Sequence, residues 1–156
     1  MQTGAHKTNR RRSFKNENPQ ISDMSLKSIG IAAERDLVHK LQEMGFAAIR
    51  VAGSGSTQTP STDILAGNGS RILSIECKTT RNAARYVEKI AISDFVAFSR
   101  QFGAEPWIAV RFTRSPWRFL LVEDLPVTER SVAITKEFAE TRGLLLSEVL
   151  NYPILN

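Results

Sequence analysis

Residues 62–78, TDILAGNGSRILSIECK, constrain the fold more than any other stretch of the chain. Two apolar runs flank Asn68-Gly69, which is the strongest short-range signal for a β-hairpin. A two-residue loop at this dipeptide would place Gly67 opposite Ser70. The segment therefore predicts two antiparallel strands with a tight turn between them.

The hairpin brings charged side chains onto one face of the sheet. Side chains alternate along a strand, so Glu76 and Lys78 point the same way, about 7 Å apart, and Cys77 fills the opposite, apolar face. In the two-residue register Asp63 lies opposite Ser74, which makes Glu76 its diagonal neighbour on that face. We expect two acids and a lysine to converge there.

The rest of the chain alternates helical and extended patterns. Apolar residues recur at helical spacing from Leu26 to Met44, and Gly45 is expected to end that helix. Residues 79–91 look like a basic connector, and Ser93 is expected to cap a second helix that ends at Gly103. Strands are predicted at 46–52, 106–112, 117–122 and 132–134, with one or two short helices before residue 150. This order predicts an α/β fold with a central mixed β-sheet flanked by helices.

Helix 26–44 supplies a third carboxylate. Glu34 lies at the edge of the apolar stripe, beside Val38 and Leu41, so we expect it to point inward at the sheet. Three carboxylates and a lysine on a partly buried surface would repel one another unless a divalent cation held the acids. Mg²⁺ suits these oxygen ligands best, and Mn²⁺ is an expected substitute.

A metal at this site could activate water for phosphodiester hydrolysis, with Lys78 orienting that water or neutralising a phosphate oxygen. Structural alternatives remain open at this point. Glu76 and Lys78 could form an ion pair at a sheet end, Asp63 could cap a strand, and Glu34 could lie on a solvated helix flank.

Composition excludes several other chemistries. The single cysteine rules out an intramolecular disulfide framework and a zinc site built from several thiolates, and two histidines make a Ser-His-Asp triad improbable. The net charge is +5, and residues 71–118 hold nine basic and four acidic side chains. The body of the chain is thus polarised, with a basic middle that favours a nucleic-acid partner.

Residues 1–23 are polar, basic and without periodicity, so we expect a disordered arm before a single nuclease domain over 24–156. The alternative is that translation starts at Met24, in which case the protein has no such arm. The chain lacks a secretory signal and any apolar run of the roughly 18 residues that span a bilayer. We therefore expect a cytoplasmic, nucleoid-associated protein without membrane contact.

Several segments in continuous order over residues 28–122 resemble the archaeal Holliday junction resolvases, structure-selective endonucleases with the type II restriction-endonuclease-like fold. The matching segments are GIAAERDLVHKLQEMGFAAIRVAGSGS, TDILAGNG, SIECK, FSRQFGAEPWIAVRF and WRF. The chain departs from the usual pattern at Thr62, where many relatives carry proline, and at Cys77, which replaces a more typical aliphatic residue.

The resemblance implies roles for individual residues. Glu34, Asp63 and Glu76 would serve the metal site, and Lys78 would be the catalytic lysine. Ser54 matches a serine near the scissile phosphate. Arg35 and Arg50 match basic residues implicated in junction binding or catalysis. Phe98 and Phe102 match an aromatic face used for dimerisation, although an ordinary core stripe is the alternative for both.

The implied activity is the resolution of four-way branched DNA. A junction of this kind has near two-fold symmetry, and a homodimer with two equivalent sites makes the two matched nicks directly. The basic residues expected to meet phosphates around the site are Arg71, Arg81, Arg85 and Lys89. Two rivals stay open, a fork or flap nuclease of the same fold and a junction-binding paralogue that does not cut, as does the identity of any recombination or clamp protein partner.

Overall fold

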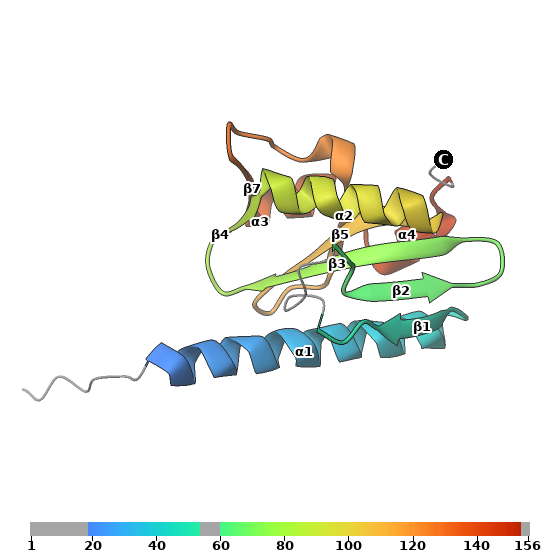
Figure 1. The fold of residues 1–156 in the computed structure, drawn as a ribbon, viewed down its shortest axis with the longest axis horizontal. Helices are drawn as coiled ribbons and strands as arrows, with labels where there is room; N and C mark the ends of the chain where they lie inside the picture. Colours follow the sequence, from blue (N-terminus) through green and yellow to red (C-terminus); the bar gives the residue numbers. More distant parts are fainter. Residues whose placement is uncertain (1–18, 54–59, 154–156) are drawn as a thin grey trace, which may run out of the picture.

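The computed structural model describes residues 19–53 and 60–153, with side chains from residue 25 onward. Four strands follow the first helix, and helices and strands are mixed in the rest of the chain (Figure 1). In order they are α1 (Pro19–Glu43), β1 (Ala47–Arg50), β2 (Ile64–Gly67), β3 (Ile72–Thr80), β4 (Ala84–Glu88), α2 (Lys89–Phe102), β5 (Glu105–Phe112), β6 (Arg118–Leu121), the 3-10 helix η1 (Val122–Asp124), β7 (Ser131–Thr135), α3 (Lys136–Arg142) and α4 (Leu146–Asn151).

The centre of the fold is a five-stranded mixed sheet with the strand order β1-β2-β3-β5-β6. β3 and β5 run parallel, and the other neighbouring strands run antiparallel. β4 and β7 form a separate antiparallel pair. In Figure 1 α1 lies on one side of the sheet and α2 on the other. The predicted α/β class, a central mixed sheet flanked by helices, is confirmed.

Strand β5, an interior strand of the sheet, is buried on both faces because each face packs against a different helix. Trp107 and Ala109 belong to the apolar cluster that contains the buried side chains of α1. Ile108 and Val110 alternate with them and belong to the second cluster, which contains Phe95 of α2. A near-continuous apolar strand of this kind is typical of sheets that are covered on both sides.

The hairpin forms, but with a longer loop than predicted. Gly67 pairs with Ile72, not Ser70, so four residues form the turn. Asn68 stabilises this turn, because its Oδ1 accepts hydrogen bonds from the backbone N–H groups of Ser70 and Arg71, and Gly69 adopts a φ of +87°. The two extra loop residues keep the parity of the pairing, so the predicted faces of the strands are retained.

Helix α1 begins earlier than predicted. It starts at Pro19, so its first turn includes residues that we assigned to the arm, and the remainder of the arm lies outside the described residues. The helix ends at Glu43, and Gly45 follows with a φ of +87°, as expected for a glycine that terminates a helix.

The segment predicted as a connector contains secondary structure. Strand β4 lies within residues 79–91 and pairs with β7. Helix α2 begins at Lys89 with Glu88 as its N-cap, so Ser93 is an interior residue and does not cap the helix. Gly103 ends α2 in a left-handed conformation, with a φ of 76°, as predicted. No helix among the described residues is long and apolar enough to cross a membrane.

Candidate active site

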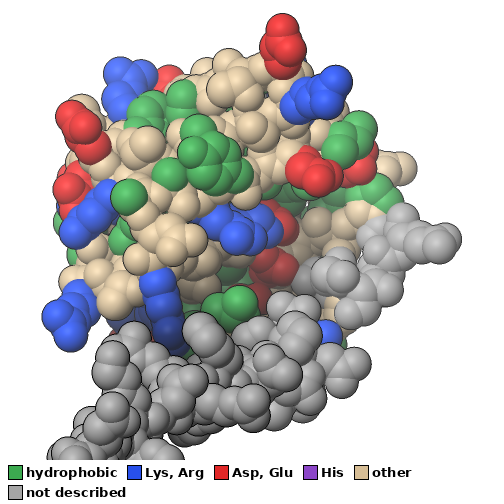
Figure 2. All heavy atoms as spheres, turned by 90° about the vertical axis from the view of Figure 1, so that its left-hand side faces the viewer, with side chains coloured by type: hydrophobic (Ala, Val, Ile, Leu, Met, Phe, Trp, Pro, Cys, Tyr) green, Lys and Arg blue, Asp and Glu red, His purple; other side chains and the backbone are tan. Residues whose placement is uncertain are grey.

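The predicted charged residues meet where β3 extends beyond its pairing with β2. The last paired residue of β3 is Ile75, and Glu76 and Lys78 follow it on the extension. Asp63 directly precedes β2, and Glu34 comes from α1. Figure 2 shows acidic side chains beside a basic side chain in the middle of this face of the molecule. The site is therefore built from a helix and two strands.

Asp63 is fixed by backbone groups on both sides. Its carbonyl oxygen accepts a hydrogen bond from Val51 N at 2.8 Å. Its carboxylate Oδ2 accepts one from Cys77 N, also at 2.8 Å. The observed register, continued by one residue, places Asp63 directly opposite Glu76, closer than the diagonal position we predicted.

Thr62 extends the pairing of β2 and β3 with its side chain. The residue is fully buried, and its hydroxyl donates to the carbonyl oxygen of Ile75 at 2.9 Å. The hydroxyl thus ties the residue before Asp63 to the residue before Glu76. The sequence analysis noted Thr62 only as a departure from proline; a proline here would supply no such donor.

Glu76 and Lys78 form a close ion pair, with Lys78 Nζ 2.5 Å from Glu76 Oε1. Their side chains are 23% and 20% exposed, respectively, so the pair lies in a partly buried position open on one side. This is the ion pair that we held as the structural alternative. Because both partners remain accessible, the pairing is compatible with a catalytic role.

Glu34 points inward from α1, as predicted, and its side chain is 15% exposed. Its Oε2 accepts a hydrogen bond from Arg50 Nη1 at 3.2 Å. Arg50 stands at the end of β1, so the pair connects the helix to the edge of the sheet. The interpretation of Glu34 as a solvated helix flank is excluded.

The carboxylates interact electrostatically across the site. Burial raises the pKa of Glu76, and the charges of Asp63 and Glu34 raise it further, against the opposing effect of Lys78. Burial and then the charge of Asp63 raise the pKa of Glu34, against the effect of Arg50. Glu34 and Glu76 therefore both lie in surroundings that disfavour their ionised forms.

The described residues contain no group of three or more histidine, cysteine or acidic side chains already arranged around a metal position. Arg50 and Lys78 instead pair with two of the acids. The donor set nevertheless fits a hard divalent cation, because it consists of carboxylates whose mutual repulsion a cation would relieve. A cation would compete with both ion pairs for these oxygens.

Cys77 faces the apolar core, as the strand alternation predicts. The residue is buried among the side chains that pack under α1. Burial, followed by the charge of Asp63, raises the pKa of its thiol well above the ordinary value. A buried thiol of this kind is a poor nucleophile, so Cys77 has a packing role.

Arg71 differs from the prediction that it meets DNA phosphates. Its guanidinium forms a two-pronged ion pair with Glu105, at 2.8 Å and 2.7 Å. Its Nη1 also donates to the carbonyl oxygens of Val149, Leu150 and Tyr152 at the end of α4. The side chain is only 7% exposed, so the structure gives Arg71 an internal role and contradicts the predicted DNA contact.

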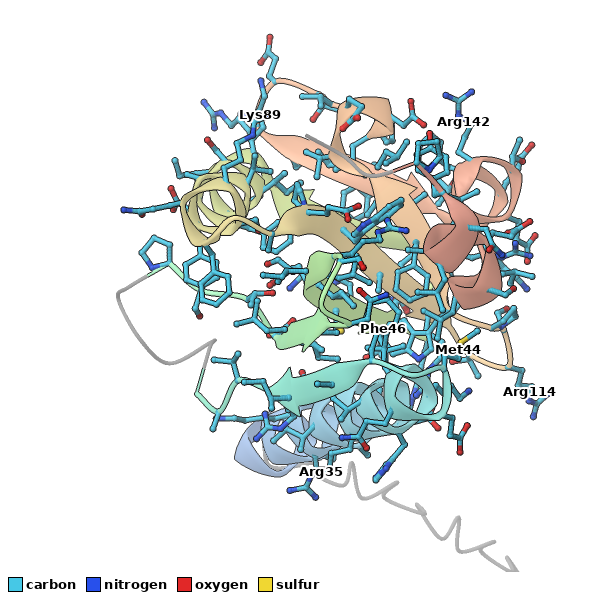
Figure 3. All side chains as sticks on the ribbon, turned by 90° about the vertical axis from the view of Figure 1, so that its right-hand side faces the viewer. Arg35, Met44, Phe46, Lys89, Arg114 and Arg142 are labelled. Atoms are coloured by element: carbon cyan, nitrogen blue, oxygen red, sulfur yellow. The ribbon has the colours of Figure 1, made fainter. Side chains whose placement is uncertain are left out.

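The other predicted basic residues are accessible. Arg35 on α1, Arg81 after β3, Arg85 on β4 and Lys89 at the start of α2 are all exposed. Figure 3 shows Arg35 and Lys89 pointing outward from the body of the protein. Arg50 is half-buried in its pair with Glu34, and Ser54 lies outside the described residues.

Two further arginines share a groove with Lys78 and were missed. Arg111 on β5 donates to Asp36 on α1 at 3.1 Å and stacks over the ring of Trp117. Arg114 projects from the turn between β5 and β6 (Figure 3). In the sequence these residues belong to a strand and its turn, and only the parallel pairing of β3 with β5 brings them beside Lys78.

Phe98 and Phe102 lie on the outer side of α2. Their rings stack with centroids 5.9 Å apart, and Phe102 is 50% exposed. Phe95 instead points into the core and is 3% exposed. The alternative of an ordinary core stripe for Phe98 and Phe102 therefore does not hold for Phe102, whereas Phe98 is partly buried.

Comparisons with known proteins agree with this architecture. The archaeal Holliday junction resolvase (Hjc) family matches residues 25–154. The crossover junction endodeoxyribonuclease Hjc of Archaeoglobus fulgidus is 43% identical over 124 residues, which cover 80% of this chain and 90% of that protein. The Hje enzyme of Saccharolobus solfataricus is 36% identical over 119 residues, covering 72% of this chain and 88% of its own.

A solved structure matches as well. The 1.6 Å structure of Archaeoglobus fulgidus Hjc, a Holliday junction resolvase from an archaeal hyperthermophile, superposes with a TM-score of 0.72 and 41% sequence identity. The match covers 77% of this chain and 97% of that one. The predicted restriction-endonuclease-like sheet is thus the fold of a solved resolvase. From its fold, its sequence and the order of its charged residues, the chain belongs to the archaeal Holliday junction resolvase family.

Proposed function

We propose that this protein is a magnesium-dependent endonuclease that resolves four-way DNA junctions by paired, symmetric nicks. The observation that carries the proposal is the convergence of Asp63, Glu76 and Lys78 at the extension of β3, in a chain of the resolvase family. Relatives that are 34% to 43% identical to this chain are named crossover junction endodeoxyribonucleases.

Glu34, Asp63 and Glu76 would hold the cation, with Mn²⁺ able to replace Mg²⁺. A bound divalent ion supplies an acidified water and a counter-charge for phosphate oxygens. Lys78 pairs with Glu76. Its ammonium group could leave that carboxylate to pair with a phosphate oxygen, or it could orient the attacking water. Ser54 is assigned a contact near the scissile phosphate from the family resemblance.

Arg50 would act through Glu34, because their ion pair fixes the direction of that carboxylate. Arg35, Arg81, Arg85 and Lys89 would bind the phosphates of the junction arms, since all four are exposed. Such contacts carry no base sequence, which suits an enzyme that selects branched shape. Work on chromosomal DNA would place the protein in the cytoplasm, at the nucleoid.

A homodimer would provide the two active sites that paired nicks require. The stacked rings of Phe98, which is partly buried, and Phe102, which is exposed, support α2 as the contact between protomers. Exposed aromatic side chains are the residue types that most often anchor protein interfaces.

Cleavage of end-labelled DNA tests the proposed activity. A four-way junction, a replication fork and a linear duplex are each incubated with the protein in Mg²⁺ and again in EDTA. The proposal predicts Mg²⁺-dependent nicks at opposed positions of the junction alone. Equal cutting of all three substrates would identify a less selective nuclease, and tight junction binding without nicks would identify a non-cutting paralogue.

A further inference from the structure

The apolar face of α1 continues past the part of the helix that the sheet covers. Leu41, Leu37 and Ala33 on this face are at most 1% exposed and pack in the core. One and two turns closer to the N-terminus, Ile29 and Leu26 are 37% and 57% exposed. The apolar stripe therefore runs out of the core and along the wall of a groove.

This groove is a hollow of about 530 Å³ that opens beside the catalytic lysine. Leu26, Ile29 and Gly30 form its α1 wall. The end of β3, with Lys78, and the turn between β5 and β6 form the other walls. Its volume falls within the range of roughly 300–1,000 Å³ that is typical of small-ligand clefts.

The wall opposite α1 is basic. Lys78, Arg81, Arg85, Arg111 and Arg114 line the groove, and none of the described lining residues is acidic. A groove with one apolar wall and one cationic wall matches the chemistry of a nucleotide. Its phosphate is anionic, whereas its base presents an apolar surface.

The turn that presents Arg114 is held in an unusual conformation. Arg114 has a φ of 61°, which residues with a Cβ seldom adopt. Thr113 ties this turn to the end of β3, because its backbone N–H donates to Thr80 O at 3.1 Å. Strain of this kind is kept most often where it positions a functional group.

We propose that this groove holds one unstacked nucleotide next to the scissile phosphate, with its base against Leu26 and Ile29 and its phosphate against Arg81, Arg85 and Arg114. The inference rests on the proposed function and deepens it. Unstacking costs least where pairing is already interrupted, so the groove would favour cleavage at a branch point over cleavage in a duplex. Leucine and isoleucine are among the side chains that proteins insert between unstacked bases.

Gly30 offers a direct test, because its missing side chain leaves the groove open. A Cβ at this helical position would meet no heavy atom within 4 Å, so the side chain of Gly30→Leu can start into the groove without a clash at Cβ. Ala32→Leu is the matched control, since Ala32 is exposed on the same helix and does not line the groove. Gly30→Leu should melt at or above the wild-type temperature, because leucine favours helices over glycine. Ala32→Leu should melt close to the wild-type temperature, because alanine and leucine differ little in helix propensity.

Binding to a fluorescent four-way junction is measured by anisotropy in metal-free buffer. Gly30→Leu should weaken binding by about ten-fold, the lower range for losing one stacked base, and Ala32→Leu should bind as the wild type does. Wild-type affinity in Gly30→Leu would overturn the inference.

The identity of the occupant is tested with junctions that carry one abasic site, moved stepwise through the positions that flank the cut. At one position the abasic site should weaken wild-type binding, and Gly30→Leu should then cause no further loss. If the ratio of the Kd of Gly30→Leu to the Kd of the wild type is the same for every junction, no base enters the groove and the inference is wrong. Arg114→Ala should reduce the slope of log Kd against log salt by about one, and an unchanged slope would contradict the phosphate contact.

These binding measurements separate the inference from the proposed function. A wild-type protein that cuts no junction in Mg²⁺ would contradict the proposed activity. The Kd ratios of Gly30→Leu to wild type, on intact and abasic junctions, would still show whether a nucleotide binds in the groove. If the protein cuts junctions but the abasic site does not change the effect of Gly30→Leu, the proposed activity stands and the inference about the groove is wrong.

Discussion

At the scale of one residue, the ionised carboxylate of Glu76 lowers the stability of the folded protein. Burial and the neighbouring acids raise its pKa above the ordinary value of 4.5, so the folded protein binds this proton more tightly than the unfolded chain does. The ionised carboxylate is thus tolerated because other contacts hold the site together. Such trade-offs between stability and activity are common at active sites.

We therefore expect Glu76→Gln to be more stable than the wild type at pH 7, because the variant carries no charge that burial and the neighbouring acids disfavour. In the wild type, the protonated Glu76 favours the folded state, and this contribution to stability is fully present below pH 4.5. It is lost as the pH rises through the pKa of Glu76 in the folded protein, where the carboxyl group ionises. The advantage of the variant should consequently disappear below pH 4.5. Urea unfolding at several pH values checks this, with Glu140→Gln, an exposed glutamate on α3, as the control. A destabilised Glu76→Gln at pH 7 would contradict the account.

Arg71 is the residue whose role the sequence misrepresents. The variant Arg71→Ala removes the counter-charge of buried Glu105 and three hydrogen bonds at the end of α4. Loss of one partner of a buried ion pair typically costs about 3–5 kcal/mol, and we expect a loss of stability on this scale. Junction affinity of the folded variant should be unchanged. An unaltered melting temperature with weakened DNA binding would restore the original prediction.

At the scale of elements, sequence patterns correctly predicted the features that neighbouring residues determine. The Asn68-Gly69 turn, the periodic stripe of α1 and the glycine after α2 all appear where the sequence indicated them. The loop length was wrong because Asn68 caps a four-residue turn through its side chain, which the dipeptide signal does not encode. The site survived this error, since a shift of two residues leaves every side chain on its face.

Elements that depend on distant partners were less predictable. Strand β4 has only one buried residue, Val87, and its pairing with β7 bridges more than 40 residues of chain, so no local apolar pattern marks it. Arg71 looked like other basic residues because Glu105, its partner, is 34 positions away. Likewise, the groove beside Lys78 exists only after β3 and β5 have paired.

Helix α2 carries the prediction about assembly. The double change of Phe98→Ala and Phe102→Ala removes the stacked pair of rings and leaves Phe95 in the core. We expect the proposed dimer to weaken by at least about 2 kcal/mol, the scale of an interface hot spot. Light scattering after size exclusion measures this across protein concentrations. Tyr86→Ala, which removes an exposed aromatic ring from β4, is the control, and an unchanged dimer in the double variant would exclude α2 as the interface.

At the scale of the whole molecule, helix, sheet edge and hairpin must be in place together for the acids to meet. Cation binding should therefore stabilise the entire fold. At ten times its Kd, Mg²⁺ should raise the free energy of unfolding by about 1.4 kcal/mol. The shift should be smaller at pH 5 than at pH 8, because the raised pKa values of Glu34 and Glu76 make protons stronger competitors there. Thermal melts with and without Mg²⁺ measure it; an equal shift in Glu76→Gln would mean that the ion binds elsewhere.

Cleavage of a supercoiled plasmid that extrudes a cruciform tests the central claim most directly, because a cruciform is a four-way junction whose resolution linearises the circle. The account predicts that the wild type in Mg²⁺ yields linear DNA with little nicked circle. Glu76→Gln, with its acid at the β3 extension neutralised, should cut at least about 100-fold more slowly while binding the cruciform as tightly. Accumulation of nicked circles as the end product, or cutting by Glu76→Gln at the wild-type rate, would contradict it.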